Sequence, residues 1–331
     1  MPRKIPRWVW LAAPLAYFLY FYRLGATGLL GPDEPRYASI AREMARSGDW
    51  ITPRLWGQPW FEKPALLYWF GAAGFRLGLG PEWAPRLAVA VVAVAFLVFY
   101  FRVLRREFGE PSACFATLIL GTCVGWVGFS QIAVPDLLLT AFFSAAMLLA
   151  LPWIAKGDER LLPAAAALLG VAVLAKGLVP LVLALPLAMR GGIRSLLRPR
   201  VAAPFLVVAL PWYLLCYLRN GGEFLKVFFW QQQFDRFTSG ALMHLQPWWF
   251  YIPVLLGAML PWTPLAALAG GRREAWRDPR RRFLLAWVLF GLLFFSASAN
   301  KLPGYILPLL PAAAALAALG LSEAGNARAW L

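Results

Sequence analysis

The chain has 331 residues, of which 61% are hydrophobic and only 15% are charged, and its mean hydropathy is +0.62. This composition excludes a soluble globular protein and predicts an all-α polytopic membrane protein, because a segment in hydrocarbon must satisfy its own backbone hydrogen bonds. The net charge of +16 would suit a nucleic-acid partner, but the cations gather in short segments between apolar runs, so no nucleic acid is expected. All the cysteines lie inside apolar runs, which favours packing over a disulfide or a metal site.

Apolar runs of membrane-spanning length follow one another along most of the chain. We predict about ten transmembrane helices, at residues 8–25, 84–101, 112–130, 135–154, 161–175, 178–189, 201–218, 248–269, 283–297 and 303–321. The first resembles a signal peptide, but the aromatic residues 20–22 make a poor cleavage site, so we expect an uncleaved span. The short segments on the side of the N-terminus carry most of the cations, which predicts that both termini are cytoplasmic.

Residues 31–80 form a long polar loop, which this topology places outside the membrane. Its first part has apolar residues at helical spacing opposite charged residues, which predicts an amphipathic helix in the membrane interface with Pro35 in its first turn and residues 47–49 at its end. A second interfacial helix is expected to begin at residues 62–64. Its aromatic residues 68–70 are predicted to anchor it at the interface.

The starts of these two helices carry unusual charges. An aspartate directly before a helix is an ordinary N-cap, and this alternative stays open for Asp33. However, Glu34 doubles the negative charge where one capping oxygen would suffice, and Lys63 stands at a helix N-terminus, where a cation is unfavourable. A bound anion would explain the cations, because Arg36 and Lys63 together suit a phosphate group.

Polar residues from further outer segments share this side of the membrane: Asp136, Lys176, Arg236, His244, Lys301 and Tyr305. Several have ordinary alternatives. An aspartate at a helix start is usually an N-cap, and a lysine beside a short span usually extends to the lipid headgroups. A lone histidine is more often structural than a metal ligand. Nevertheless, helix caps and headgroup contacts alone are a poor explanation for six polar residues on the same side of the membrane.

Such a face suits sugar transfer from a polyprenyl-phosphate donor, because the leaving phosphate needs cations around it. Arg36, Lys63 and Arg236 are candidates to bind the phosphate, with Tyr305 as a hydrogen-bond donor. A carboxylate near the anomeric carbon could orient an acceptor hydroxyl or take its proton, and direct displacement would invert that carbon. We predict Asp33 in this role.

The motifs that carry these residues are PDEPRYASIAREMARSGDW, FEKPALLYW, VPD, LAKG, QQQFDRF, QPWWFY and KLPGYILP. In this order, and over nearly the whole chain, they resemble the membrane domain of the superfamily that contains the aminoarabinose transferases of lipid A and the protein O-mannosyltransferases, the class C glycosyltransferases. The first two motifs are specific, whereas VPD and LAKG alone would be weak. The resemblance implies an enzyme of the bacterial inner membrane with its active site facing the periplasm.

By this resemblance, Asp33, with Glu34 beside it, matches the catalytic aspartate of the superfamily, and the predicted phosphate-binding residues match positions that hold the lipid phosphate. The implied donor is a polyprenyl-phosphate sugar, and the acceptor is lipid A, a related glycolipid or a protein hydroxyl. Glu62 matches an acidic residue associated with a metal in aminoarabinose transferases, which makes zinc the candidate cofactor. The matching histidine is replaced here by Gln232, unless His244 substitutes for it.

The sequence predicts one transmembrane glycosyltransferase domain over residues 1–331, without the soluble outer domain of the relatives. Two other classes stay open. A transporter of polyprenyl phosphate or glycolipid would show an inverted repeat, and no internal repeat is recognisable in the sequence. A non-catalytic protein that binds membrane lipids would keep Lys63 and Arg236 but tolerate the loss of Asp33.

Overall fold

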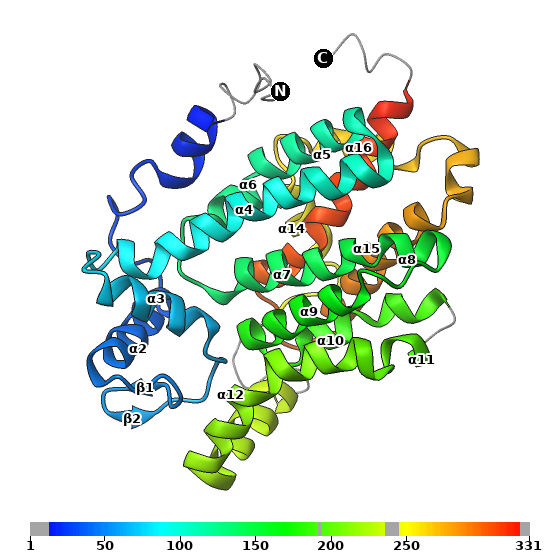
Figure 1. The fold of residues 1–331 in the computed structure, drawn as a ribbon. Helices are drawn as coiled ribbons and strands as arrows, with labels where there is room; N and C mark the ends of the chain where they lie inside the picture. Colours follow the sequence, from blue (N-terminus) through cyan, green and yellow to red (C-terminus); the bar gives the residue numbers. More distant parts are fainter. Residues whose placement is uncertain (1–12, 191–192, 236–244, 325–331) are drawn as a thin grey trace, which may run out of the picture.

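The computed structural model describes residues 13–190, 193–235 and 245–324, which are mostly helical (Figure 1). One antiparallel pair of short strands interrupts the helices in the first loop. The α-helices are α2 (Asp33–Ser47), α3 (Leu66–Arg76), α4 (Trp83–Phe108), α5 (Glu110–Thr122), α6 (Val124–Ser130), α7 (Pro135–Leu149), α8 (Leu151–Lys156), α9 (Leu162–Lys176), α10 (Val179–Leu183), α11 (Ile193–Leu196), α12 (Pro199–Leu225), α14 (Tyr251–Ala258), α15 (Pro279–Ala297) and α16 (Leu310–Glu323). The shorter elements are η1 (Tyr17–Phe21), η2 (Leu185–Arg190), η3 (Lys226–Asp235), η4 (Thr263–Gly270), η5 (Arg273–Arg277), η6 (Pro303–Leu309), β1 (Arg54–Leu55) and β2 (Gln58–Pro59).

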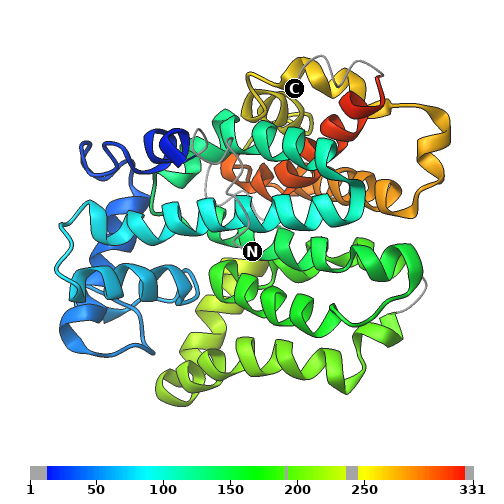
Figure 2. The ribbon, with the colours of Figure 1, turned by 45° about the horizontal axis from the view of Figure 1, so that its top comes forward.

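Six long helices pack as successive neighbours across the molecule, in the order α16, α5, α4, α7, α9 and α12 (Figure 1). Helices α7 and α16 are the most enclosed. In the most apolar 18-residue window of Pro135–Lys156 and of Pro303–Glu323, 83% of the residues are buried within the protein, against 33% in that of Trp83–Phe108 and 22% in that of Pro199–Gln232. The α2–α3 region lies at one end of these helices, beside the start of α4 (Figures 1 and 2).

By length and apolar composition, four stretches of the described chain could cross a membrane, or five if the bent pair α5 and α6 is one span. The number of about ten spans is therefore not confirmed. The stretches are Trp83–Phe108, Pro135–Lys156, Pro199–Gln232 and Pro303–Glu323. The expected span at 112–130 is bent by 57°, because Cys123 is extended and the N–H of Val124 donates to the carbonyl of Leu260. The expected spans at 178–189 and 248–269 are each divided into an α-helix and a 3-10 helix.

Helices α2 and α3 lie side by side and run in the same direction. The rings of Tyr37 and Tyr68 are 6.0 Å apart near the helix starts, and the Nε of Arg76 donates to the carbonyl of Ala45 at 3.1 Å near the helix ends. The apolar face predicted for α2 consists of Tyr37, Ile40, Ala41 and Met44, and it is buried within the protein, so the predicted position of this helix in the membrane interface is not confirmed. Its main partner is α3. The left-handed Gly48 ends α2, as the sequence predicted.

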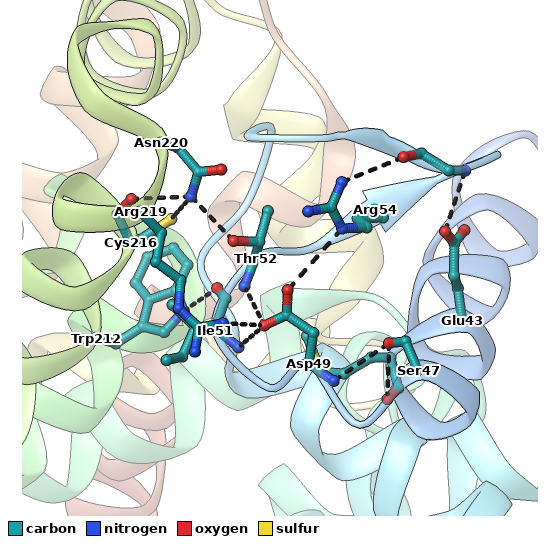
Figure 3. Close-up of polar contacts among 12 residues, drawn as sticks. Glu43, Ser47, Asp49, Ile51, Thr52, Arg54, Trp212, Cys216, Arg219 and Asn220 are labelled. Carbon is teal, nitrogen blue, oxygen red and sulfur yellow. Dashed lines mark hydrogen bonds and ion pairs between the residues drawn. The ribbon is translucent and has the colours of Figure 1, made fainter.

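The loop between α2 and α3 is attached to α12 by polar contacts (Figure 3). Arg219 Nη1 lies 2.8 Å from Asp49 Oδ1, and Asn220 Nδ2 donates to Thr52 Oγ1 at 3.0 Å. Just beyond these residues, α12 bends at Gly221, where φ is 62°. A loop held at both ends can keep the starts of α2 and α3 in a defined arrangement.

Candidate active site

The starts of the two parallel helices bring four of the predicted site residues together. Arg36 Nη2 donates to Asp33 Oδ1 on α2 and lies 3.1 Å from Glu62 Oε2 in the segment before α3. Lys63 Nζ lies 3.2 Å from Glu62 Oε1. Two acidic and two basic groups thus form one connected cluster, which the sequence placed at two separate helix starts.

Asp33 is not an N-cap in this structure. The capping position of α2 belongs to Pro32, which makes no side-chain cap hydrogen bond, and α2 begins at Asp33 itself. The side chain of Asp33 is 42% exposed and accepts a hydrogen bond from Arg36. It is therefore oriented by a cation and still accessible to a substrate.

Glu62 is surrounded by donors. Its carboxylate accepts hydrogen bonds from the hydroxyl of Tyr37 at 3.4 Å and from the indole N–H of Trp60 at 3.3 Å, in addition to its contacts with Arg36 and Lys63. A metal ion here would stand beside two cations, so this donor set does not fit a divalent metal. No group of three His, Cys, Asp or Glu side chains that could hold a metal occurs within the described residues. Glu62 instead holds the two cations in place.

Glu34 occupies a different environment from Asp33. Its side chain and that of Arg86 on α4 are each 1% exposed, and they form a two-pronged ion pair with both N···O distances at 2.7 Å. The carboxylate also accepts from the N–H groups of Leu30 at 2.6 Å and Ala133 at 2.7 Å. With four donors on two buried oxygens, Glu34 cannot reach a substrate. The geometry gives it a positioning role in place of the catalytic role expected beside Asp33.

Arg86 makes further hydrogen bonds besides its ion pair with Glu34. Its guanidinium also donates to the carbonyls of Leu24, Thr27 and Gly28 at 2.8–2.9 Å. The pair therefore ties the segment before α2 to the start of α2, to α4 and to Ala133, which lies two residues before α7. Removal of either partner would leave a buried charge uncompensated.

Glu34 predicts a pH dependence of stability. Burial by itself would raise the pKa of Glu34, but the bonds from Arg86 and the two backbone amides hold it below the ordinary value of 4.5. Because the folded pKa is lower than the unfolded one, the stabilisation is complete at neutral pH and is lost as the pH falls below about 4.5. We expect the Tm to fall with acidification in this range, and less steeply in Glu34→Gln. Thermal unfolding at a series of pH values measures both slopes, and equal slopes would contradict the role of Glu34.

A second cluster lies where α7 begins and α9 ends. Lys176 Nζ is 2.5 Å from Asp136 Oδ1, with side chains 11% and 14% exposed, and 4.2 Å from the ring centroid of Tyr305. The alternatives of an N-cap for Asp136 and a headgroup contact for Lys176 are therefore wrong: Val134 holds the cap position of α7, and Lys176 points into the protein. A Cβ on Gly304 would lie 2.9 Å from Asp136 Oδ1, so only glycine fits beside this pair.

The remaining predicted site residues are Lys301, Arg236 and His244, with Gln232 at the position of the missing histidine. Lys301 is buried, and its Nζ donates to the carbonyl of Ser298 at 2.6 Å, which is a structural contact. Arg236 and His244 lie outside the described residues. Gln232 is half-buried near the end of η3. Of the residues predicted to bind phosphate, Arg36 and Lys63 are thus the ones that lie in the first cluster.

Comparisons with known proteins agree with the sequence motifs. The family described as dolichyl-phosphate-mannose-protein mannosyltransferase matches residues 62–217. Undecaprenyl phosphate-alpha-4-amino-4-deoxy-L-arabinose arabinosyl transferase 2 from Pseudomonas fluorescens is 35% identical over 98% of this chain and 58% of its own length. A crystal structure of ArnT from Cupriavidus metallidurans bound to undecaprenyl phosphate is 32% identical, with a TM-score of 0.88 over 98% of this chain and 61% of that chain. Over almost its whole length the chain is thus similar to part of the class C glycosyltransferases.

The chain spans about three fifths of the length of these class C relatives. The apo oligosaccharyltransferase from Archaeoglobus fulgidus is 14% identical, with a TM-score of 0.59 over 95% of this chain and 50% of that chain, and this likeness concerns the fold alone. The family match includes both clusters' residues from Glu62 to Lys176 but begins after Asp33.

Two residues that bind the acidic side chains of this region were not predicted from the sequence, and a third was misassigned. Arg86 and Trp60 were not singled out, because their local sequence does not indicate their partners. Arg86 pairs with Glu34, which is 52 residues away, and the indole of Trp60 donates to the carboxylate of Glu62. Tyr68 was predicted to anchor α3 at the interface, but it is fully buried. Burial raises the pKa of Tyr68 well above its ordinary value, and its hydroxyl has no hydrogen-bond partner in the described chain.

Proposed function

We propose that the chain is an integral membrane glycosyltransferase that moves a sugar from a polyprenyl-phosphate donor to an acceptor of the bacterial envelope, with inversion of the anomeric carbon. The acceptor is lipid A, a related glycolipid or a protein hydroxyl. The observation that carries this proposal is the cluster of Asp33, Arg36, Glu62 and Lys63, in which an accessible carboxylate stands beside two oriented cations.

The cluster suits each part of a displacement reaction. The donor phosphate would bind Arg36 and Lys63 and share them with Glu62, which keeps the cations in position before the donor arrives. The acceptor oxygen forms a bond to the anomeric carbon as the bond from that carbon to the phosphate oxygen breaks. Asp33 takes the proton of an acceptor hydroxyl, and the polyprenyl phosphate leaves with the bonding electrons, stabilised by the two cations. A phosphate acceptor is already ionised, and Asp33 then orients it.

The proposed orientation places this site on the outer side of the inner membrane, with both termini cytoplasmic. The α2–α3 region and the start of α7 lie at one end of the long helices, and α8, α11 and η5 lie at the other (Figure 1). The second end carries the basic residues at the ends of α4 and α8, at Arg105, Arg106 and Lys156. A basic end is typical of the cytoplasmic side. The two helices α2 and α3 then lie near the outer membrane surface.

Lys63→Ala is expected to weaken binding of a polyprenyl phosphate by about tenfold to a hundredfold, because a charged hydrogen bond to the phosphate is lost. Lys156→Ala removes the same charge at the opposite end of the helices and is expected to leave binding unchanged. Titration of the purified variants with undecaprenyl phosphate measures both affinities. Equal affinity of Lys63→Ala and the wild type would refute the phosphate site.

The activity itself is tested by mass spectrometry of lipid A and envelope glycans from cells with and without the protein. A transferase adds a sugar to an acceptor, and the modification disappears with the protein. A transporter or a lipid-binding protein moves or holds the lipid and forms no new glycosidic bond. Purified protein that binds donor but yields no glycosylated product from any of the three acceptor classes would therefore contradict the proposal.

A further inference from the structure

A basic hollow of about 490 Å³ lies away from the two clusters, where α2 and α3 end. Three guanidinium groups line it together with four apolar residues: Arg42, Arg46, Arg76, Ala45, Phe75, Leu79 and Pro81. Since α2 and α3 are parallel, their starts form the first cluster and their ends form this hollow. Arg36 and Arg46 are ten residues apart on α2, which corresponds to about 15 Å along the helix axis.

The three arginines have no carboxylate partner within the described residues. Arg42 lies over the ring of Phe75, with 5.2 Å between the guanidinium carbon and the ring centroid. Arg76 lies over the ring of Trp50 at 5.6 Å and donates to the carbonyl of Ala45. The nearby Glu43 accepts from the N–H of Gly57. Aromatic rings and a backbone carbonyl therefore hold two of the cations, while their charge stays unneutralised.

Cations near a helix C-terminus have an ordinary explanation, because they interact favourably with the helix dipole. That explanation covers Arg46 and Arg76, which lie in the last turns of α2 and α3. It does not cover Arg42, which lies one turn earlier. Arg42 and Arg46 are at i and i+4, where like charges repel, and Arg76 adds a third charge. An anion in the hollow would remove this repulsion.

The surroundings of the hollow indicate the source of the anion. Leu79 and Pro81 form its apolar side, and the adjacent Leu77 is 79% exposed. The same segment leads directly into α4, a stretch that could cross a membrane and that begins with the exposed Trp83. Cations beside apolar residues at the end of a membrane span match the boundary between headgroups and acyl chains.

We propose that this hollow binds the phosphate group of an anionic lipid headgroup, with Arg42, Arg46 and Arg76 as its ligands. The bound lipid holds the ends of α2 and α3 at the membrane surface, about 15 Å along α2 from the donor-phosphate residues. This binding does not depend on the proposed sugar transfer, since none of the three arginines belongs to the first cluster.

Native mass spectrometry of the full chain tests the proposal with phosphatidylglycerol and phosphatidylcholine of identical acyl chains. We expect the wild type to retain phosphatidylglycerol preferentially, and Arg42→Gln/Arg46→Gln to bind it about tenfold more weakly or worse. Arg54→Gln/Arg160→Gln also removes two charges, both outside the hollow, and should bind phosphatidylglycerol as the wild type does. Because Arg46 is exposed, Arg46→Gln alone gives a folded variant if the double variant is unstable.

A second arm measures protection of the same variants from thermal unfolding by inorganic phosphate without added lipid. One outcome is that phosphate protects the wild type but not Arg42→Gln/Arg46→Gln, while the wild type shows no preference between the two lipids. This outcome supports a phosphate site and assigns it to a soluble anion in place of a lipid. Equal retention of the two lipids together with no protection by phosphate overturns the proposal. Retention of phosphatidylglycerol by Arg42→Gln/Arg46→Gln at the wild-type level overturns it as well.

Discussion

Asp33→Asn is expected to lower the rate of sugar transfer by about a hundredfold to ten-thousandfold, the range that a general base contributes. The amide keeps the size of the side chain but can neither take a proton nor carry the charge that pairs with Arg36. Asp33 is 42% exposed and caps no helix, so its replacement should leave the fold intact. Donor binding should persist, because Arg36 and Lys63 remain.

This prediction requires three measurements on one preparation: transfer with a polyprenyl-phosphate sugar, affinity for undecaprenyl phosphate, and the Tm. Asp158→Asn is a matched control, because Asp158 pairs with Arg160 in the α8–α9 connection, far from the cluster along the chain. Full activity in Asp33→Asn would remove Asp33 from the catalytic role. A large loss of Tm in the same variant would show that Asp33 acts on the fold instead.

Arg86→Leu is expected to destabilise the protein by about 3–5 kcal/mol, because it leaves the buried carboxylate of Glu34 without its partner. Three backbone carbonyls lose their donor as well. The start of α2 is then no longer tied to α4, so we expect the rate of transfer to fall together with the Tm. Thermal and denaturant unfolding in detergent measure the stability.

The double variant Glu34→Leu/Arg86→Leu distinguishes a lost charge balance from lost packing. With both charges removed, no uncompensated charge stays buried, so the double variant should be more stable than Arg86→Leu. Arg160→Leu, which breaks an exposed ion pair, should leave stability unchanged. If Arg86→Leu were as stable as Arg160→Leu, the ion pair of Glu34 and Arg86 would contribute nothing to the stability of the fold.

The first cluster was largely predictable because its residues lie in two short motifs at helix starts. Periodicity placed the helix that begins at Asp33, and the charges of Glu62 and Lys63 marked the second motif, although α3 begins later, at Leu66. The structure adds that the two starts meet through Glu62, since α2 and α3 are parallel. Parallel packing of two helices joined by a loop of 18 residues, 48–65, is decided by side-chain fit and leaves no local pattern.

The separation of Asp33 from Glu34 was not predictable. Adjacent residues on a helix point in different directions, and only the position of Arg86 on α4 shows which of the two carboxylates is buried. Asp136 and Lys176 were assigned separate ordinary roles because each, in its own segment, matches a cap or a headgroup contact. Their ion pair exists because α7 and α9 are packed neighbours.

Composition and motif order alone establish the class of this protein: helical, membrane-spanning, and equipped with a charged site in its first polar loop. These properties follow from local chemistry, because backbone satisfaction in lipid and helical periodicity depend on contiguous residues. Only the tertiary structure decides which carboxylate is accessible, which is paired, and where the arginines of α2 and α3 gather. Those facts depend on contacts between residues far apart in the chain, which burial and packing determine.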